Sequence, residues 1–183
     1  MRIISGKFKG RRFRAPSNIP TRPTTDTAKE GLFNILNNYY NFDRVSFLDL
    51  FMGTGAISYE FASRGCTDIT SVDLFPACVK FAKKMTDDLQ IEGMQVIQAD
   101  VLQFIKFSQR QYDIIFAGPP YPMEEIPLLP DMVLENNMLT DVGWFILEHS
   151  PDHDFTDHPN LEQIRMYGKT TFSIFTKTKI SED

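Results

Sequence analysis

A glycine turn close behind a carboxylate is the first feature of this 183-residue sequence whose residue types and spacing could do chemistry. Asp49 lies in an apolar run that leads through Gly53-Thr54-Gly55 into a helical pattern. A strand, a glycine turn and a helix in this order point the free N–H groups of the first helical turn at a ligand. Glycine suits the turn because a missing Cβ permits unusual backbone angles and close approach of a ligand.

The turn differs from the dinucleotide-binding pattern G-x-G-x-x-G, because Ser58 stands at its third glycine position. The carboxylate of Asp49 at the mouth of the turn would also repel a pyrophosphate. A neutral or cationic ligand would tolerate it. A nicotinamide-dependent oxidoreductase is therefore the least favoured of the nucleotide-binding classes.

The elements that must position this turn alternate between strand-like and helix-like patterns. The strand-like runs are Phe47–Leu50, Ile69–Val72, Met94–Gln98, Tyr112–Phe116 and Trp144–Leu147, and the helical patterns are Ala56–Arg64, Pro76–Leu89, Val101–Phe107 and Leu128–Asn136. This alternation predicts an α/β fold with a mostly parallel, doubly wound sheet. Two later runs, Ile164–Tyr167 and Thr171–Phe175, predict an antiparallel hairpin at the C-terminal edge.

Ligands bind beyond the C-terminal ends of parallel strands, so the polar residues at those ends are expected to converge. Asp49, Asp73 and Asp100 follow three successive strands, and Gly118-Pro119-Pro120-Tyr121 follows the fourth. Asp73 stands where nucleotide-binding folds place a carboxylate for ribose hydroxyls. Asp100 could accept from an adenine amino group, or it could cap the helix that begins at Val101.

The N-terminal segment is strongly basic although the whole chain has a net charge of −5. Its basic residues are Arg2, Lys7, Lys9, Arg11, Arg12, Arg14 and Arg22, and no acid occurs before residue 26. Interleaved aromatic and turn residues predict a small β-hairpin over residues 2–14. Such a segment could grip RNA, with Phe8 and Phe13 stacked on bases or packed under the hairpin, or it could be a solvated tail.

A proline-rich connector, Pro16 to Pro23, leads into a helix predicted within Arg22–Leu36, for which Thr24, Thr25 or Asp26 can provide the cap. We expect one domain over residues 1–183, with a basic arm (1–21) and a catalytic body (22–183). An apolar share of 42% and a charged share of 23% are typical of soluble proteins. The absence of a signal or membrane run and the two cysteines, Cys66 and Cys78, favour a cytoplasmic protein with reduced thiols.

Other chemistry finds little support in the sequence. His149, His153 and His158 lie in a predicted loop without the spacing of a common metal site, so we expect no metal. Glu148-His149-Ser150 looks like a hydrolase triplet, but adjacent residues at a strand end cannot converge as a catalytic triad does.

With these motifs in this order, the chain resembles the class I S-adenosylmethionine-dependent methyltransferases, and more narrowly the RsmD-type family. The motifs are RIISGKFKGRR, RPTTD, LDLFMGTGAISYE, SVDLF, QADV, the PPY loop and RMYGKTTFSIF. The resemblance implies a Rossmann-like methyltransferase fold and methylation of the exocyclic N2 of a guanine in 16S ribosomal RNA. It also implies S-adenosyl-L-methionine as cofactor and the small ribosomal subunit or an assembly intermediate as partner. We expect a monomer.

The resemblance carries roles to matching positions. The implied cofactor site consists of Asp49, Phe51, Gly53, Gly55, Asp73, Leu74, Asp100 and Val101. The implied target-base loop consists of Gly118, Pro119, Pro120 and Tyr121, in which the ring stacks on a flipped guanine and the diproline fixes carbonyl acceptors. The basic residues of the arm, with Tyr121, would contact the RNA.

Two positions depart from the family pattern. Gly118 stands where the family has Asp or Asn, and Thr27 stands where it often has arginine. Losing one hydrogen bond to a reacting group typically costs about 1–3 kcal/mol, or roughly ten- to a hundredfold in rate. The sequence therefore leaves open a slower enzyme, whose turnover Gly118→Asp would raise, or a non-catalytic RNA-binding or assembly factor. A methyltransferase for DNA or a protein amide is a further alternative, because PPY also occurs there.

Overall fold

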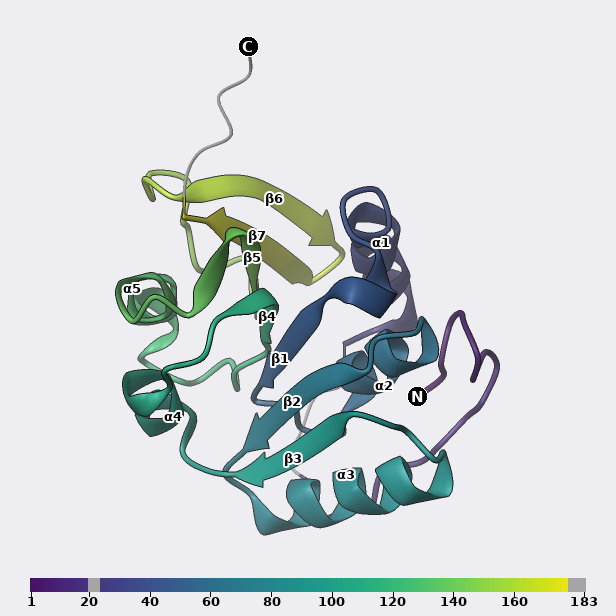
Figure 1. Ribbon diagram of the computed structural model, residues 1–183. Helices are drawn as coiled ribbons and strands as arrows, with labels where there is room; N and C mark the ends of the chain where they lie inside the picture. Colours follow the sequence, from purple (N-terminus) through teal and green to yellow (C-terminus); the bar gives the residue numbers. More distant parts are fainter. Residues whose placement is uncertain (20–23, 178–183) are drawn as a thin grey trace.

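The computed structural model describes residues 1–19 and 24–177, so Arg22 lies outside the described residues. A seven-stranded sheet of order β3-β2-β1-β4-β5-β7-β6 forms its centre (Figure 1). The strands are β1 (Ser46–Leu50), β2 (Asp68–Asp73), β3 (Met94–Gln98), β4 (Tyr112–Ala117), β5 (Leu139–His149), β6 (Leu161–Tyr167) and β7 (Thr170–Thr176). The predicted doubly wound fold is confirmed.

Strands β1 to β5 pair in parallel, and β7 pairs antiparallel with both β5 and β6. The predicted C-terminal hairpin is therefore confirmed as β6 and β7, with Gly168 at a positive φ of 61° in its turn. Strand β5 begins five residues before the predicted run. Its first residue, Leu139, pairs with Tyr112 of β4, and the register shifts before Trp144 pairs with Ile114. Gly143 lies within this shift, where a Cβ would be 3.0 Å from the Tyr112 carbonyl oxygen.

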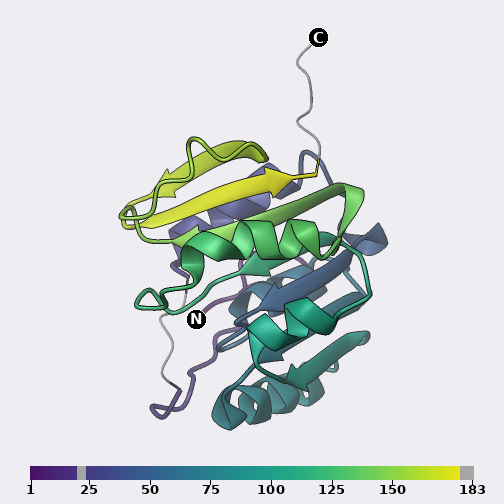
Figure 2. The same ribbon diagram turned by 90° about the vertical axis from the view of Figure 1, so that its left-hand side faces the viewer.

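Helices cover both faces of the sheet. They are α1 (Asp26–Leu36), α2 (Ala56–Ser63), α3 (Pro76–Asp88), α4 (Val101–Phe107) and α5 (Leu129–Glu135), with short 3₁₀ turns η1 (Phe42–Arg44) and η2 (Ile126–Leu128). Helices α4 and α5 lie over one face (Figure 2), and α1, α2 and α3 lie on the other. Of the three candidate caps for α1, Thr25 is the one that accepts from the backbone N–H of Ala28, at 3.2 Å.

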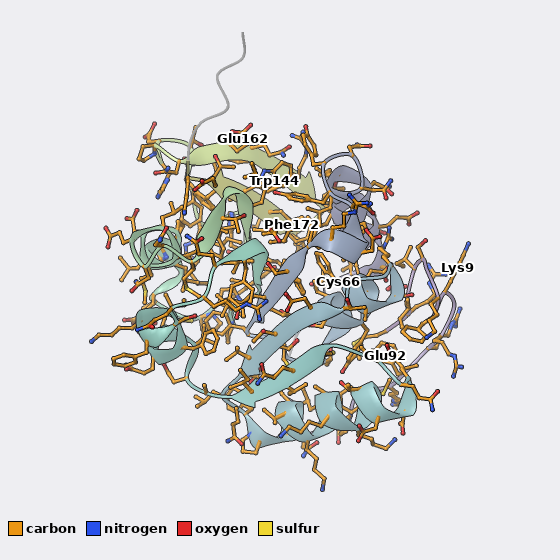
Figure 3. All side chains as sticks on the ribbon, in the orientation of Figure 1. Lys9, Cys66, Glu92, Trp144, Glu162 and Phe172 are labelled. Carbon is orange, nitrogen blue, oxygen red and sulfur yellow. The ribbon has the colours of Figure 1, made fainter. Side chains whose placement is uncertain are left out.

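The core between the sheet and α1 and α2 is rich in aromatic rings. Phe47 of β1 stacks on Phe61 of α2 with ring centroids 3.7 Å apart, and Phe33 of α1 meets Phe61 edge to face. Burial of each such ring contributes roughly 2–3 kcal/mol. Figure 3 places Trp144, Phe172 and Cys66 in this layer. Both cysteines are free and buried, and no helix among the described residues has the length and apolarity to cross a membrane.

The N-terminal arm forms a minimal version of the predicted β-hairpin, in which residues 1–3 pair antiparallel with residues 10–13. A single antiparallel bridge joins Arg2 to Arg12, and Gly6 and Gly10 turn the chain at positive φ between them. Backbone hydrogen bonds join Ile3 to Gly10 and Arg11 and join Met1 to Phe13, and the turn between the two halves also bonds to the body. Residue Lys7 donates its N–H to the Ser63 carbonyl at 2.6 Å, and a Cβ at Gly6 would lie 1.8 Å from that same oxygen.

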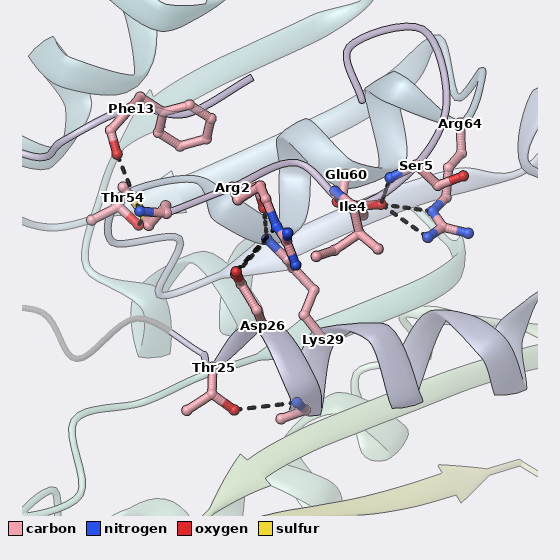
Figure 4. A network of polar contacts seen from close by, with 12 residues as sticks. Arg2, Ile4, Ser5, Phe13, Thr25, Asp26, Lys29, Thr54, Glu60 and Arg64 are labelled. Atoms are coloured by element: carbon pink, nitrogen blue, oxygen red, sulfur yellow. Dashed lines mark hydrogen bonds and ion pairs between the residues drawn. The ribbon is translucent and has the colours of Figure 1, made fainter. Parts of the chain in front are cut away.

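A fully buried carboxylate holds this segment in place. Glu60 of α2 accepts the backbone N–H groups of Ile4 and Ser5 at 2.8 and 3.0 Å, and it pairs with Arg64 (Figure 4). On the other side of the arm, the buried ammonium of Lys29 donates to the Arg2 carbonyl. Residues 1–19 are therefore packed onto the body, and the alternative of a solvated tail is wrong for them.

Substitution of Glu60 tests this attachment. In Glu60→Gln the charge-assisted bonds to the two N–H groups are lost, and the guanidinium of Arg64 loses its counter-charge. We expect the free energy of unfolding to fall by about 2–4 kcal/mol and cleavage within residues 1–14 to become faster. Urea denaturation and limited proteolysis measure the two effects. The exposed Glu92→Gln is the matched control, and equal behaviour of the two variants would contradict the assigned role.

Candidate cofactor and target-base site

One cavity of about 630 Å³ lies at the carboxyl ends of the five parallel strands. Its size is that of an ordinary small-molecule site. Almost all residues predicted for the cofactor and the base loop line it, namely Asp49, Phe51, Gly53, Asp73, Leu74, Asp100, Val101, Gly118, Pro119, Pro120 and Tyr121. Gly55 stands just behind this lining, at the N-cap of α2.

The sheet topology explains why these residues meet. After β1 the chain adds β2 and β3 on one side of that strand. It then crosses back and adds β4 and β5 on the other side of β1. Leu50 is registered with Ala117, and Gly118 donates its N–H to the Leu50 carbonyl at 3.3 Å. The cavity therefore lies at the switch point of the sheet, where α/β proteins bind ligands.

The glycine turn after β1 has the strained geometry expected of a ligand loop. Phe51, Gly53 and Gly55 all adopt positive φ, and a Cβ at Gly55 would lie 2.5 Å from the ring of Tyr59. Gly55 begins α2 without a side-chain cap, so the first N–H groups of the helix are not taken by a side chain. Such groups can receive the carboxylate of a bound amino acid.

Asp49 is a buried carboxyl, only 1% exposed. It accepts from the hydroxyl of Ser58 at 2.6 Å, and that hydroxyl lies 2.7 Å from the hydroxyl of Ser71 on β2. Burial raises the pKa of Asp49 to about 7, and the nearby carboxylates of Asp73 and Glu148 add to the increase. Asp49 is therefore poised to ionise when a cation approaches.

Asp73 joins the loops that follow β1 and β2. Its two carboxylate oxygens accept the backbone N–H groups of Gly53 and Phe75, both at 2.9 Å. A carboxylate has about four acceptor sites, so further donors such as hydroxyls can still bind. Asp100 is exposed and caps α4 by accepting from the N–H of Gln103 at 2.9 Å, which confirms one of its two sequence-based interpretations.

The described lining of the cavity is acidic. Its carboxylates are Asp49, Asp73, Asp100, Glu125 and Glu148, and none of the described lining residues is Lys, Arg or His. Carboxylates repel a phosphate and attract a cation at close range. These acidic side chains thus fit a cationic methyl donor such as S-adenosylmethionine, and they do not fit the pyrophosphate of a dinucleotide.

The loop that follows β4 forms the opposite wall. Gly118 is half-buried and Pro119 is buried, and the N–H of Met123 closes a turn onto the Pro120 carbonyl at 2.9 Å. Gly118 does not adopt positive φ, and a Cβ there would lie 3.2 Å from the ring of Phe116. The backbone does not require a glycine at this position.

Sequence reasoning assigned no site role to four polar lining residues, Thr24, Thr54, Glu125 and Glu148, and two of these are bonded to each other. The hydroxyl of Thr24 donates to Oε2 of Glu148 at 2.5 Å. Glu148 lies near the end of β5, and this strand-end position is the sequence signal that could have placed it in the site. Thr24 belongs to the RPTTD motif. The two residues are 124 positions apart, and no local pattern connects them.

The arm residues expected to contact RNA lie outside the cavity. Arg2, Lys7, Lys9, Arg11, Arg12 and Arg14 are exposed. Arg14 borders a second, smaller hollow that shares Thr54 with the main cavity, so the arm reaches its rim. Phe8 is buried, and Phe13 packs against Tyr59 with ring centroids 5.2 Å apart. Of the two interpretations of these rings, packing is the one that the structure shows.

A parallel sheet of this order, with one antiparallel strand beside β5 and a glycine turn after β1, defines a class I methyltransferase fold. The family model for "Conserved hypothetical protein 95" matches residues 1–176. The chain belongs to this family. The RsmD-type assignment and the enzyme class expected from the sequence, an RNA methyltransferase, are confirmed by this match and by the relatives below.

Ribosomal RNA small subunit methyltransferase D of Buchnera aphidicola subsp. Baizongia pistaciae is 32% identical over 148 residues, which are 81% of this chain and 75% of the relative. The protein of the same name from Haemophilus influenzae is 31% identical over 156 residues, 83% of this chain and 80% of its own length. A solved hypothetical protein of Thermus thermophilus superimposes with a TM-score of 0.85 at 26% identity, covering 96% of this chain and 99% of that one.

The raised pKa of Asp49 predicts a pH-dependent stability difference. Its folded-state pKa of about 7 exceeds the ordinary value of about 4, so the carboxyl opposes folding increasingly as pH rises through that window, and fully above pH 7. Asn cannot ionise. The melting temperature of Asp49→Asn relative to wild type should therefore rise by a few degrees between pH 5 and pH 8. Differential scanning calorimetry measures this, with exposed Asp157→Asn as control. A pH-independent difference for Asp49→Asn would contradict the assignment.

Proposed function

We propose that this chain transfers a methyl group from S-adenosyl-L-methionine to the exocyclic N2 of a guanine in 16S ribosomal RNA. The observation that carries the proposal is the joining of three features at one rim: an acidic cavity, a diproline loop and a basic arm. Membership in the family, and relatives named small subunit methyltransferase D, support the substrate class.

The cofactor would lie across the ends of β1, β2 and β3. The first N–H groups of α2 and the turn at Gly53 and Gly55 would hold its amino-acid end, and Asp49 would face its positive charge. Asp73 and the neighbouring Leu74 would bind the ribose. Asp100 and Val101 would border the adenine. When bound, S-adenosylmethionine supplies a methyl group activated by a sulfonium charge.

The loop Gly118-Pro119-Pro120-Tyr121 would receive the target base. The two proline rings fix φ and hold the loop carbonyls in place as acceptors. Tyr121 is half-buried at the cavity wall, where its ring can stack on a base that has left its helix. Alignment of the base with the methyl carbon would supply much of the acceleration.

The exposed cations of the arm would bind the RNA backbone next to this loop. Residues 1–19 contain no acidic residue, although Arg2 pairs with Asp26 at 3.4 Å, and Arg14 lies at the rim that connects the arm to the cavity. Cations that neutralise phosphates release counterions, and they give RNA binding its dependence on salt. The substrate is then a small subunit or its assembly intermediate in the cytoplasm, bound by a monomer.

A second candidate function is a non-catalytic factor that binds RNA during subunit assembly. Gly118 is the observation that favours it, because a glycine offers no acceptor for the amino group. Such a factor would bind RNA through the arm and transfer no methyl group. One assay of methyl transfer separates the two functions.

The central assay uses labelled S-adenosylmethionine and small subunits purified from cells that lack this methyltransferase. We expect close to one methyl group per subunit, and we expect digestion to nucleosides to give N2-methylguanosine. Fully modified subunits serve as the control and should accept none. No incorporation with a protein that binds the cofactor would favour the assembly factor, and a different methylated nucleoside would overturn the assigned target.

The arm is tested by removal of charge, because deletion would also remove the buried Ile3 and Phe8. A triple variant with Gln at Lys9, Arg11 and Arg12 should reduce the salt slope of RNA binding by about 2–3, with cofactor affinity unchanged. Filter binding at several salt concentrations measures the slope. Gln at exposed Lys106, Arg165 and Lys169 gives a control of equal charge change. The same slope in both triple variants would refute the arm's role.

A further inference from the structure

The structure places a carboxylate next to the position where the base loop lacks one. A Cβ built on Gly118 would lie 3.8 Å from Oε2 of Glu148. Ala117 and Leu147 are registered partners in the parallel pair of β4 and β5, so Gly118 and Glu148 are the next residues along these neighbouring strands. A side chain at position 118 would begin within contact distance of this carboxylate.

Glu148 is held in a defined position. It is only 7% exposed, it lines the cavity, and Thr24 donates to its Oε2 at 2.5 Å. It also lies close enough to Asp49 to contribute to the raised pKa of that group. Burial of a carboxylate beside another acid is unfavourable unless hydrogen bonds or a ligand compensate it. The hydrogen bond from Thr24 offsets part of this cost and leaves the carboxylate at the cavity wall.

We propose that Glu148, positioned by Thr24, accepts a hydrogen bond from the amino group that is methylated and so replaces the side chain missing at Gly118. This inference rests on the proposed function and assigns a catalytic residue within it. The carboxylate comes from β5 instead of the loop after β4, but it reaches the same side of the cavity.

The chemistry assigned to Glu148 is orientation followed by proton acceptance. One N–H of the amino group donates to the carboxylate, which turns the nitrogen lone pair toward the methyl carbon. The new N–C bond forms as the C–S bond breaks, and the electron pair of that bond stays on sulfur. The methylated nitrogen then carries one proton too many. It releases this proton to the carboxylate of Glu148, from which it passes to water.

The proposal replaces the sequence-based expectation for Gly118→Asp. In the wild-type background the Cβ of the new aspartate would lie 3.8 Å from Oε2 of Glu148, so the two carboxylates would repel each other. We therefore expect Gly118→Asp alone to leave turnover unchanged or lower. In a chain that lacks the Glu148 charge, the same substitution should restore a carboxylate that can accept both the hydrogen bond and the proton.

The test compares Glu148→Gln, Gly118→Asp and the double variant by methyl transfer to small subunits. Glu148→Gln should lower kcat ten- to a hundredfold with little change in KM for the cofactor. The double variant should recover to within about threefold of wild type. Exposed Glu135→Gln is the matched control and should keep full activity. Full turnover of Glu148→Gln, or a loss that Gly118→Asp does not rescue, overturns the proposal.

If Glu148→Gln does not fold, Thr24→Val provides the comparison, because it keeps the carboxylate but removes the donor that fixes it. A several-fold loss of kcat is expected there, and an unchanged kcat overturns the positioning by Thr24.

A calorimetric measurement tests Glu148 independently of activity and of the proposed RNA substrate. Sinefungin carries an amino group in place of the transferred methyl, whereas S-adenosylhomocysteine carries nothing there. A carboxylate facing that point raises affinity for sinefungin relative to S-adenosylhomocysteine. We expect this ratio to fall about three- to tenfold in Glu148→Gln, and an unchanged ratio contradicts the inference. If wild type binds both ligands but methylates no subunit, the proposed function fails while this ratio still decides the role of Glu148.

Discussion

Buried negative charge at the carboxyl ends of parallel strands is the constraint on which the rest of this structure depends. Asp49, Asp73 and Glu148 come from three strands, and all three side chains are at least nine-tenths buried around one cavity. Each is compensated by a specific donor, from Ser58, from two backbone N–H groups and from Thr24 respectively. These bonds hold the loops after β1 and β2 and connect β5 to the segment before α1.

The same principle attaches the arm. Glu60 is fully buried in α2, the helix that begins at the glycine turn, and its bonds to Ile4 and Ser5 fix the N-terminal segment beside the cavity. One short helix thus presents its first N–H groups to the ligand site and its later carboxylate to the arm. The RNA-contacting surface and the cofactor site are positioned by one element, so the arm's cations keep a constant relation to the target-base loop.

The fold could be predicted from the sequence because hydrophobic runs and turn residues are local signals. Four of the five parallel strands and all of the helices in the body fall within two residues of their expected bounds. The attachment of the arm to the body could not be predicted, because its residues bond to Ser63 and Glu60, about 55 positions away. Glu148 was missed for the same reason. The role inferred for this side chain depends on the register of β4 and β5 and on the hydroxyl of Thr24, 124 residues earlier. Neither can be inferred from spacing in the sequence.

The most direct measurement of the central claim, that buried carboxylates select a cationic methyl donor, is the proton exchange that accompanies ligand binding. Titration calorimetry of S-adenosylmethionine at pH 6, in two buffers of different ionisation enthalpy, should reveal release of a substantial fraction of a proton, because the approaching charge ionises Asp49. The release should be nearly absent at pH 8 and smaller for S-adenosylhomocysteine, whose sulfur is neutral. Equal proton release for both ligands, or none for either at pH 6, would contradict the account.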